Sequence, residues 1–265
     1  MPESTRWYMS KGMYHKVIEM LRRISKVNGK SPEPGIYNEF LKNISLDNNT
    51  VENATIFDLR KTPHLRKNIF LLAIAFSFST LIMDTHIYYS NRYNMSVFIS
   101  FSWFSLEIFF ASTVSKFTAN LWGLRFNGFL GLFLTSVFSY TFVFTSNETV
   151  KLISGSIGRM SISFIQILYS QYVPEFFPTT FRAQGSGLVR FLSIIVHFIA
   201  PYVIVLASTW RELPMLIIAT LALVDSFLIL FLPETVGKCL RQTLQDGEDF
   251  CKSKKFWPIF IINNK

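Results

Sequence analysis

Long apolar runs separated by short polar segments dominate the chain from residue 69 onward. Six of these runs have the length of a membrane-crossing helix, and they lie at about 69–89, 97–115, 126–145, 150–173, 185–207 and 213–232. A helix rises about 1.5 Å per residue, so about 20 residues cross the ~30 Å hydrocarbon core of a bilayer. Because lipid offers no partner to backbone N–H and C=O groups, each run is predicted to be helical. The pattern predicts an all-α membrane protein with six transmembrane helices within residues 68–235.

The polar segments on either side of these runs are predicted to be cytosolic. Residues 236–265 are the predicted tail, and residues 1–67 combine an amphipathic helix with a flexible linker at 31–56. The apolar residues of that helix recur at helical spacing, namely Met13, Val17, Met20, Leu21, Ile24 and Val27. Ser10 is its predicted N-cap, and Asn28-Gly29 is its predicted C-cap. We expect the helix at the membrane face, where anionic headgroups or neighbouring loops meet its basic residues, Lys16, Arg22, Arg23 and Lys26.

Composition and charge narrow the class of protein. Of the 265 residues, 50% are hydrophobic and 16% are charged, whereas soluble domains carry about 25% charged residues. These values, with the long apolar runs, exclude an ordinary soluble enzyme, a disordered chain and a coiled coil. The net charge of +9 includes no basic run interleaved with aromatic residues, so no nucleic-acid partner is predicted.

The distribution of basic residues predicts the orientation. With both termini in the cytosol, the inner segments hold 12 basic residues in 1–67, two in 116–125, Arg182 and six in the tail, out of 26 in all. Short cytosolic loops carry an excess of Lys and Arg. The chain is therefore predicted to be integral to the membrane, surrounded by lipid, with both ends in the cytosol.

Polar residues recur within four of the spans at spacings of three and four, which place them on one helix face. We predict that these faces converge on a substrate path lined by Asp84, Tyr88, Glu107, Arg159, Gln166, Arg190 and His197. An ionisable group at mid-membrane costs about 2.5–3.5 kcal/mol, so each needs a partner or water. Two other interpretations stay open. Hydroxyl groups in a span often only bond to the backbone or to a neighbouring helix. Asp84 and Arg190 lie near span ends, so their charged groups can extend to the membrane surface. Asp225 has no polar stripe, and the sequence offers no account of it beyond an unseen helix-packing partner.

Motifs of several enzyme classes are absent from the sequence. It has no glycine-rich phosphate loop, no HExxH, no Gly-x-Ser-x-Gly and no paired cysteine motif. No catalytic residue, no metal and no cofactor is therefore predicted, and a membrane-embedded enzyme is the least favoured function.

The loops carry the more specific motifs. Pro2-Glu3-Ser4-Thr5-Arg6-Trp7 resembles the Pro-Glu-Ser-Pro-Arg-Trp signature after the sixth helix of the organic cation/anion transporters, a branch of the major facilitator superfamily. The segment from Glu175 to Arg182, with Gly185, is similar to their Glu-x-x-Pro-Thr-x-x-Arg-x-x-Gly loop. Pro233-Glu234-Thr235-Val236-Gly237 is similar to their Pro-Glu-Thr-x-Gly signature, and Asp84-Thr85-His86 resembles the Asp-Gly-His of arthropod members. The motifs occur in family order and extend over nearly the whole chain.

The resemblance implies the C-terminal half of a major facilitator fold, built of two inverted three-helix repeats. It implies transport of small organic ions across the plasma membrane by alternating access, together with an N-terminal half that is missing here. The chain alone is then expected to be inactive. By the same resemblance, the cytosolic gate consists of Glu3, Arg6, Arg125, Glu175, Arg182 and Glu234.

Two departures from the family pattern leave alternatives open. The turn after helix eight has three basic residues in the family, whereas Asn120-Leu121-Trp122-Gly123-Leu124-Arg125 keeps one, and Ile194 occupies a position that is often charged. Arg159, Arg190 and His197 favour an anion, Asp84 and Glu107 favour a cation, and the sequence does not decide between them. The alternative function is a non-transporting relative that serves as a membrane scaffold or regulatory subunit.

Overall fold

The structure is a computed structural model that describes residues 4–29, 35–37, 39, 42, 62–90, 97–178, 182–235 and 244–252. Glu3 and most of the predicted linker and tail lie outside these residues. The elements of the described part are all helical: α1 (Thr5–Ser10), α2 (Tyr14–Val27), α4 (Pro63–Ser90), α5 (Val97–Phe144), α6 (Glu148–Phe176), α7 (Arg182–His197), α8 (Ala200–Val205), the 3-10 turn η2 (Leu206–Ser208), α9 (Leu213–Leu230) and α10 (Leu244–Lys252). The predicted all-α class is confirmed.

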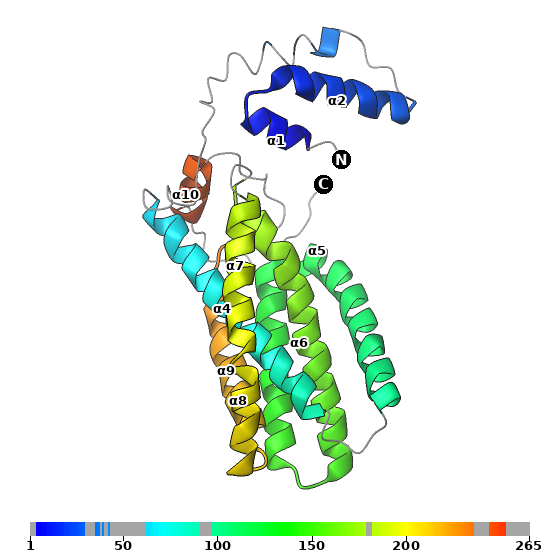
Figure 1. Cartoon of the computed structure of the whole chain (residues 1–265), viewed down its shortest axis with the longest axis vertical. Coiled ribbons are helices and arrows are strands. Elements are labelled where there is room, and N and C mark those ends of the chain that lie inside the picture. The colour runs from blue at the N-terminus through cyan, green and yellow to red at the C-terminus, as the bar shows by residue number, and fades with distance from the viewer. Residues whose placement is uncertain are drawn as a thin grey trace.

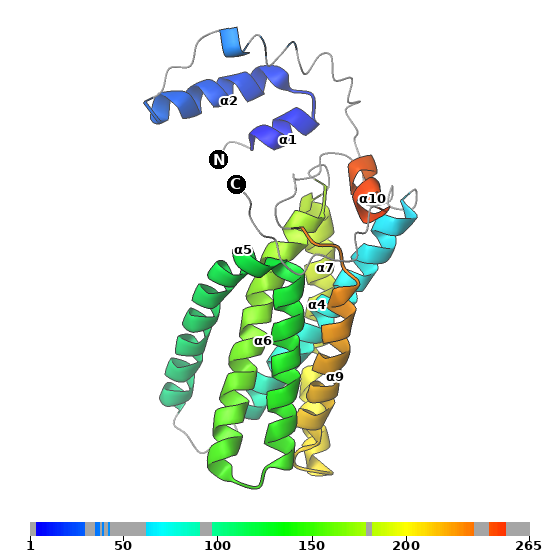
Figure 2. The same ribbon diagram turned by 180° about the vertical axis from the view of Figure 1, so that it is seen from behind.

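Helices α4 to α9 pack side by side in one bundle, from which the first part of α5 leans away (Figures 1 and 2). Buried apolar side chains from five of these helices fill its core, including Leu72, Ile82, Leu132, Ile162, Val189 and Met215. Within the described residues, four stretches are long and apolar enough to cross a membrane: Pro63–Tyr89, Leu121–Phe144, Arg182–Ser208 and Leu213–Leu230. The other two predicted spans, 97–115 and 150–173, lie in the first part of α5 and in α6. Each of these two spans includes charged residues.

The connection predicted at 116–125 is much shorter than expected, because the chain is helical on both sides of a single residue, Gly123. Its φ of 79° and ψ of 164° break α5 into two parts. Figure 1 shows these parts running in opposite directions on either side of the break. Only glycine adopts a positive φ at little cost, since it has no Cβ to collide with the backbone. A single residue, Gly123, therefore makes the turn between the two parts of α5, where the hydropathy pattern predicted a connection of ten residues.

The span predicted at 185–207 is not one continuous helix. Helix α7 ends at His197, and α8 begins at Ala200. Pro201 has no N–H to donate to the carbonyl of His197, and its ring occupies the space that the regular turn needs. Phe198 and Ile199 bond instead to carbonyls three residues back, at 3.3 and 2.9 Å. The break places His197 at a helix end within the apolar stretch.

Helices α1 and α2 lie beyond the end of the bundle at which α4 begins (Figure 1). The hydroxyl of Ser4 caps α1 by accepting a backbone N–H at 3.2 Å. The prediction that Ser10 caps the amphipathic helix is wrong, because Ser10 is the last residue of α1 and Met13 precedes α2 without a side-chain cap. The predicted C-cap is confirmed, since Asn28 is the C-cap after Val27, the last residue of α2, and Gly29 follows with a φ of 65°.

The tail helix α10 packs against the start of α4 (Figures 1 and 2). The carboxylate of Glu248, only 4% exposed, accepts the backbone N–H of His64 at 3.3 Å and that of Leu65 at 2.9 Å. The first N–H groups of a helix have no partner within it, and the helix dipole favours a negative charge at this end. Glu248 therefore holds the start of α4 in place.

Replacing Glu248 by glutamine is expected to loosen the first turn of α4. A hydrogen bond to a charged group contributes about 1.5–3 kcal/mol, against about 1 kcal/mol for a neutral acceptor. The amides of His64 and Leu65 should exchange with deuterium about five to ten times faster, as measured by mass spectrometry of the peptide that contains them. The control is Asp249→Asn at an exposed position of the same helix. Equal exchange in the two variants would contradict the capping role.

Candidate functional site

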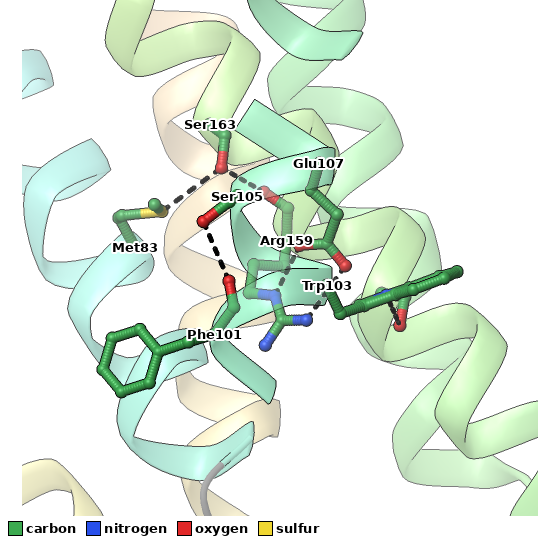
Figure 3. A network of polar contacts seen from close by, with 8 residues as sticks. Met83, Phe101, Trp103, Ser105, Glu107, Arg159 and Ser163 are labelled. Atoms are coloured by element: carbon green, nitrogen blue, oxygen red, sulfur yellow. Dashed lines mark hydrogen bonds and ion pairs between the residues drawn. The ribbon is translucent and has the colours of Figure 1, made fainter. Parts of the chain in front are cut away.

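The candidate site contains an ion pair buried between two helices, Glu107 of α5 and Arg159 of α6 (Figure 3). Arg159 Nε donates to Glu107 Oε2 at 2.7 Å, and its Nη2 donates to Oε1 at 2.9 Å. The Glu107 side chain is only 5% exposed, and the Arg159 side chain is 9% exposed. Two parallel N–H···O bonds are the strong geometry of an arginine–carboxylate pair. Each residue therefore neutralises the other inside an apolar bundle.

A narrow strip of small residues positions Glu107. Among the described side chains on the first part of α5, the buried ones are spaced four apart, and they are Glu107, Ala111, Ser115 and Ala119. Small side chains let two membrane helices approach closely. Large apolar residues on the other faces, such as Phe98 and Phe101, are exposed. The first part of α5 thus contacts the bundle along this strip, and the ion pair is the charged contact within it.

Aromatic and polar groups surround the ion pair (Figure 3). The guanidinium of Arg159 lies 5.7 Å from the ring centroid of Phe104, within the range of a cation–π interaction. The indole N–H of Trp103 donates to a hydroxyl of α6 at 3.3 Å. One turn along α6, the hydroxyl of Ser163 lies 3.7 Å from the sulfur of Met83 on α4. These contacts link α4, α5 and α6 around the charged pair.

A second pair joins Asp84 of α4 to His197 at the end of α7, through contact between a carboxylate oxygen and Nδ1 of the imidazole. The Asp84 side chain is 15% exposed and that of His197 is 47% exposed. The carboxylate is thus held inside the bundle while one side of the imidazole is open. Of the two partners, His197 is the one with room to leave.

The other predicted path residues differ in their surroundings. Gln166 of α6 donates toward Ser79 Oγ at 3.3 Å and Thr80 Oγ1 at 3.4 Å on α4. The side chains of Tyr88 and Arg190 are exposed. The structure therefore joins Glu107 with Arg159, Asp84 with His197, and Gln166 with α4, and it leaves Tyr88 and Arg190 on the surface.

The prediction of path residues did not include His86. Its side chain is 3% exposed, and Nε2 lies 3.2 Å from the Ser139 hydroxyl of α5. His86 lies two positions after Asp84, which puts it off the face that the three-and-four spacing follows. The available signal was the motif Asp84-Thr85-His86.

Asp225 of α9 corrects another expectation. A partner on a neighbouring helix was predicted, but neither carboxylate oxygen of this fully buried residue has a hydrogen-bond partner within the described residues. A run of apolar residues surrounds it in the sequence, so no stripe indicated its environment.

Three of the predicted gate residues lie near the kink in α5. Glu234 Oε1 and Oε2 accept the backbone N–H groups of Leu124 and Arg125, each at 3.0 Å, which caps the second part of α5. A Cβ at Gly123 would lie 2.8 Å from Glu234 Oε2, so the glycine also makes room for the carboxylate. The hydroxyl of the next residue, Thr235, donates to Glu175 Oε2 at 3.1 Å.

The remaining gate residues are less fully described. Arg182 Nε donates to the carbonyl of Phe177 at 3.3 Å. Arg6 lies in α1, but its side chain is outside the described part, as is all of Glu3. The grouping of Arg125, Glu175 and Glu234 is an observation, and their role as a gate stays a prediction.

A further cluster links the helices at the opposite end of the bundle, and no sequence motif indicated it. Lys151 Nζ at the start of α6 lies 2.6 Å from Glu212 Oε1, just before α9. The Tyr89 hydroxyl of α4 donates to Glu212 Oε2 at 3.0 Å. The Tyr89 ring also meets that of Phe142 edge-on, at 5.5 Å between centroids. Four helices are therefore linked at this end.

Comparison with known proteins identifies the family. A family model described as Sugar (and other) transporter matches residues 1–246. The chain belongs to this family. The resemblance drawn from the loop motifs and the predicted major facilitator fold class are thereby confirmed. With the four apolar helices, family membership makes the chain an integral membrane protein.

Relatives within the family extend well beyond this chain. It is 26% identical over 259 residues to Solute carrier family 22 member 2 of Rattus norvegicus, a match that covers 96% of this chain and 46% of the relative. It is 27% identical over 264 residues to the Organic cation transporter protein of Drosophila melanogaster, covering 95% and 47%. The chain thus spans about half the length of the relatives it matches.

Proposed function

We propose that this chain is the C-terminal half of a plasma-membrane transporter that moves small organic cations by alternating access, and that it does not transport by itself. Both termini lie in the cytosol in this proposal. The family match and the coverage of about half of each relative support it. The relative named an organic cation transporter supports the class of substrate.

The observation that carries the proposal is the position of Arg190 and His197 on α7. Both side chains are exposed, yet both lie within the apolar stretch Arg182–Ser208. The Arg190 guanidinium is always charged, and a charged group that faces hydrocarbon costs about 2.5–3.5 kcal/mol. The face of α7 that carries Arg190 and His197 is therefore more stable against a protein surface or a water-filled path than against lipid. A second six-helix half with the substrate path between the halves provides both.

The arrangement of the two pairs supports a cation as the substrate. Glu107 and Arg159 neutralise each other through two hydrogen bonds. In the second pair the Asp84 carboxylate lies inside the bundle, whereas its partner His197 is 47% exposed. An organic cation that displaces the open imidazole gains a carboxylate already held in place by α4, so it binds a preorganised site.

Contacts at both ends of the bundle are consistent with movement as one body. Glu234 joins α5 to the end of α9, and Glu212 links α9 with α4 and α6. In alternating access, one half rocks against the other around a central site. Braces within a half keep its helices together during such a movement.

The proposal predicts that Asp84→Asn removes most cation uptake. In cells that express the complete gene product, uptake of radiolabelled tetraethylammonium should fall at least about tenfold, since the asparagine gives up the charge that attracts the cation. Uptake of benzoate, an organic anion, should stay low in both proteins. Asp249→Asn on α10 is the matched control.

The same assay separates the alternative functions. The chain alone in liposomes should take up no more tetraethylammonium than empty vesicles, and a coexpressed N-terminal half should restore uptake. Transport by the chain alone would contradict the proposal of an inactive half. A complete gene product that never transports either ion, while it binds other transporters, would support the scaffold instead.

A further inference from the structure

The N-terminal helices carry an exposed apolar strip that the transport proposal does not use. Helix α2 is amphipathic, and the structure divides its apolar face into two parts. Val17, where α1 and α2 pack together, is 1% exposed. On the later turns Ile24 is 45% exposed and Val27 is 80% exposed. The second half of the apolar face therefore has no cover from the described part of the chain.

Basic residues surround this exposed strip. Residues 4–29 hold one acidic residue, Glu19, and six basic ones, namely Arg6, Lys11, Lys16, Arg22, Arg23 and Lys26. Arg23 borders an open hollow on α2, together with Met20, Ile24, Val27 and Asn28. Arg22, by contrast, lies over the ring of Tyr37 at 5.5 Å. A guanidinium thus flanks the apolar strip directly, and most of the remaining positive charge lies on the same helix.

We propose that the strip formed by Met20, Arg23, Ile24 and Val27 docks on the anionic lipid surface of the membrane that holds the bundle. Aliphatic side chains of an interfacial helix enter the boundary between headgroups and acyl chains, while basic side chains meet phosphate and carboxylate groups. The surplus of five positive charges in residues 4–29 complements an anionic leaflet. Helices α1 and α2 also lie beyond the end of the bundle at which α4 begins (Figure 2).

Spin labels on the full chain test the docked face. Cysteines are introduced as Ile24→Cys or Val27→Cys, with Glu19→Cys and Lys26→Cys as controls on the charged face, in a Cys239→Ser background. Cys251 is buried and stays in place. The protein is placed in nanodiscs of phosphatidylcholine, with or without about 30% phosphatidylserine, an anionic lipid of the cytosolic leaflet. Collisions with oxygen report contact with lipid, and collisions with a water-soluble nickel complex report contact with water.

Labels at 24 and 27 should favour oxygen over nickel only in the phosphatidylserine nanodiscs, and labels at 19 and 26 should face water in both. Water exposure at 24 and 27 in both lipids would overturn the proposal. Equal shielding at 24 and 27 in both lipids would also overturn it, because it would indicate a protein surface as the occupant.

A charge substitution tests the role of the flanking guanidinium. Each basic residue near an anionic surface contributes about a fivefold change in binding, so Arg23→Gln should lower the ratio of docked to undocked label at position 27 by about that factor. Arg22→Gln should lower it less, since that side chain lies over Tyr37. Glutamine is a good helix former, so α2 stays intact in both variants. An equal effect of the two substitutions would contradict docking through the Arg23 edge.

Discussion

Replacing Arg159 by methionine destabilises the bundle by about 3–5 kcal/mol, because the substitution leaves the Glu107 carboxylate buried without its partner. Glu107 receives both N–H···O bonds from Arg159 and is 5% exposed, so water does not replace the lost partner. The free energy of unfolding of the purified chain, measured by titration with denaturing detergent in lipid micelles, is the readout. The change should be among the largest for any single substitution in the chain.

A double variant and a surface variant make this expectation specific. Glu107→Met combined with Arg159→Met removes both charges and should recover most of the lost stability, since an apolar pair of similar volume often replaces a buried ion pair without loss. Arg190→Met, at an exposed position of α7, should cost less than about 1 kcal/mol. If Arg159→Met is no more harmful than Arg190→Met, the pair does not hold the first part of α5 to the bundle.

Replacing Gly123 by alanine has the second largest expected effect, a loss of about 3–5 kcal/mol. A positive φ costs a residue with a Cβ about 1–2 kcal/mol. The new Cβ would also lie 2.8 Å from Glu234 Oε2 and displace a carboxylate that accepts two backbone hydrogen bonds. Bonds to a charged acceptor contribute about 1.5–3 kcal/mol each, so even partial displacement is costly. The same detergent titration measures the change.

Gly187 provides the matched control for this substitution. It lies within α7, its φ is not positive, and a Cβ there would meet nothing within 4 Å. Gly187→Ala should therefore be neutral or stabilising by up to about 1 kcal/mol, because alanine favours a helix more than glycine does. If both alanine variants unfold at the same detergent concentration, the kink does not depend on Gly123.

The lengths of the apolar runs predicted the helices well, and single residues caused the two differences. The length of an apolar run shows how much of the chain is apolar. It does not show where one residue has a positive φ or where one backbone N–H is missing. Gly123 therefore replaced a predicted turn of ten residues, and Pro201 divided a predicted span into α7 and α8. Both residues are visible in the sequence, but their effect depends on the backbone around them.

The polar stripes indicated which residues need partners but not which partners they have. Glu107 and Arg159 are 52 positions apart, and no local rule connects them. Their pairing, which only the folded bundle brings about, neutralises one acid and one base of the predicted path. His86 and Asp225 show the limit of the spacing rule, because one lies off the stripe and the other has no stripe.

The sequence by itself determined that the chain is helical, lies in a membrane and resembles a transporter half, because these properties follow from run length, composition and contiguous motifs. The tertiary structure alone decided which charges neutralise each other, that Glu234 caps α5 and that Glu248 caps α4. Those contacts join groups far apart in the chain, and their strength depends on burial and orientation, which exist only once the helices have packed.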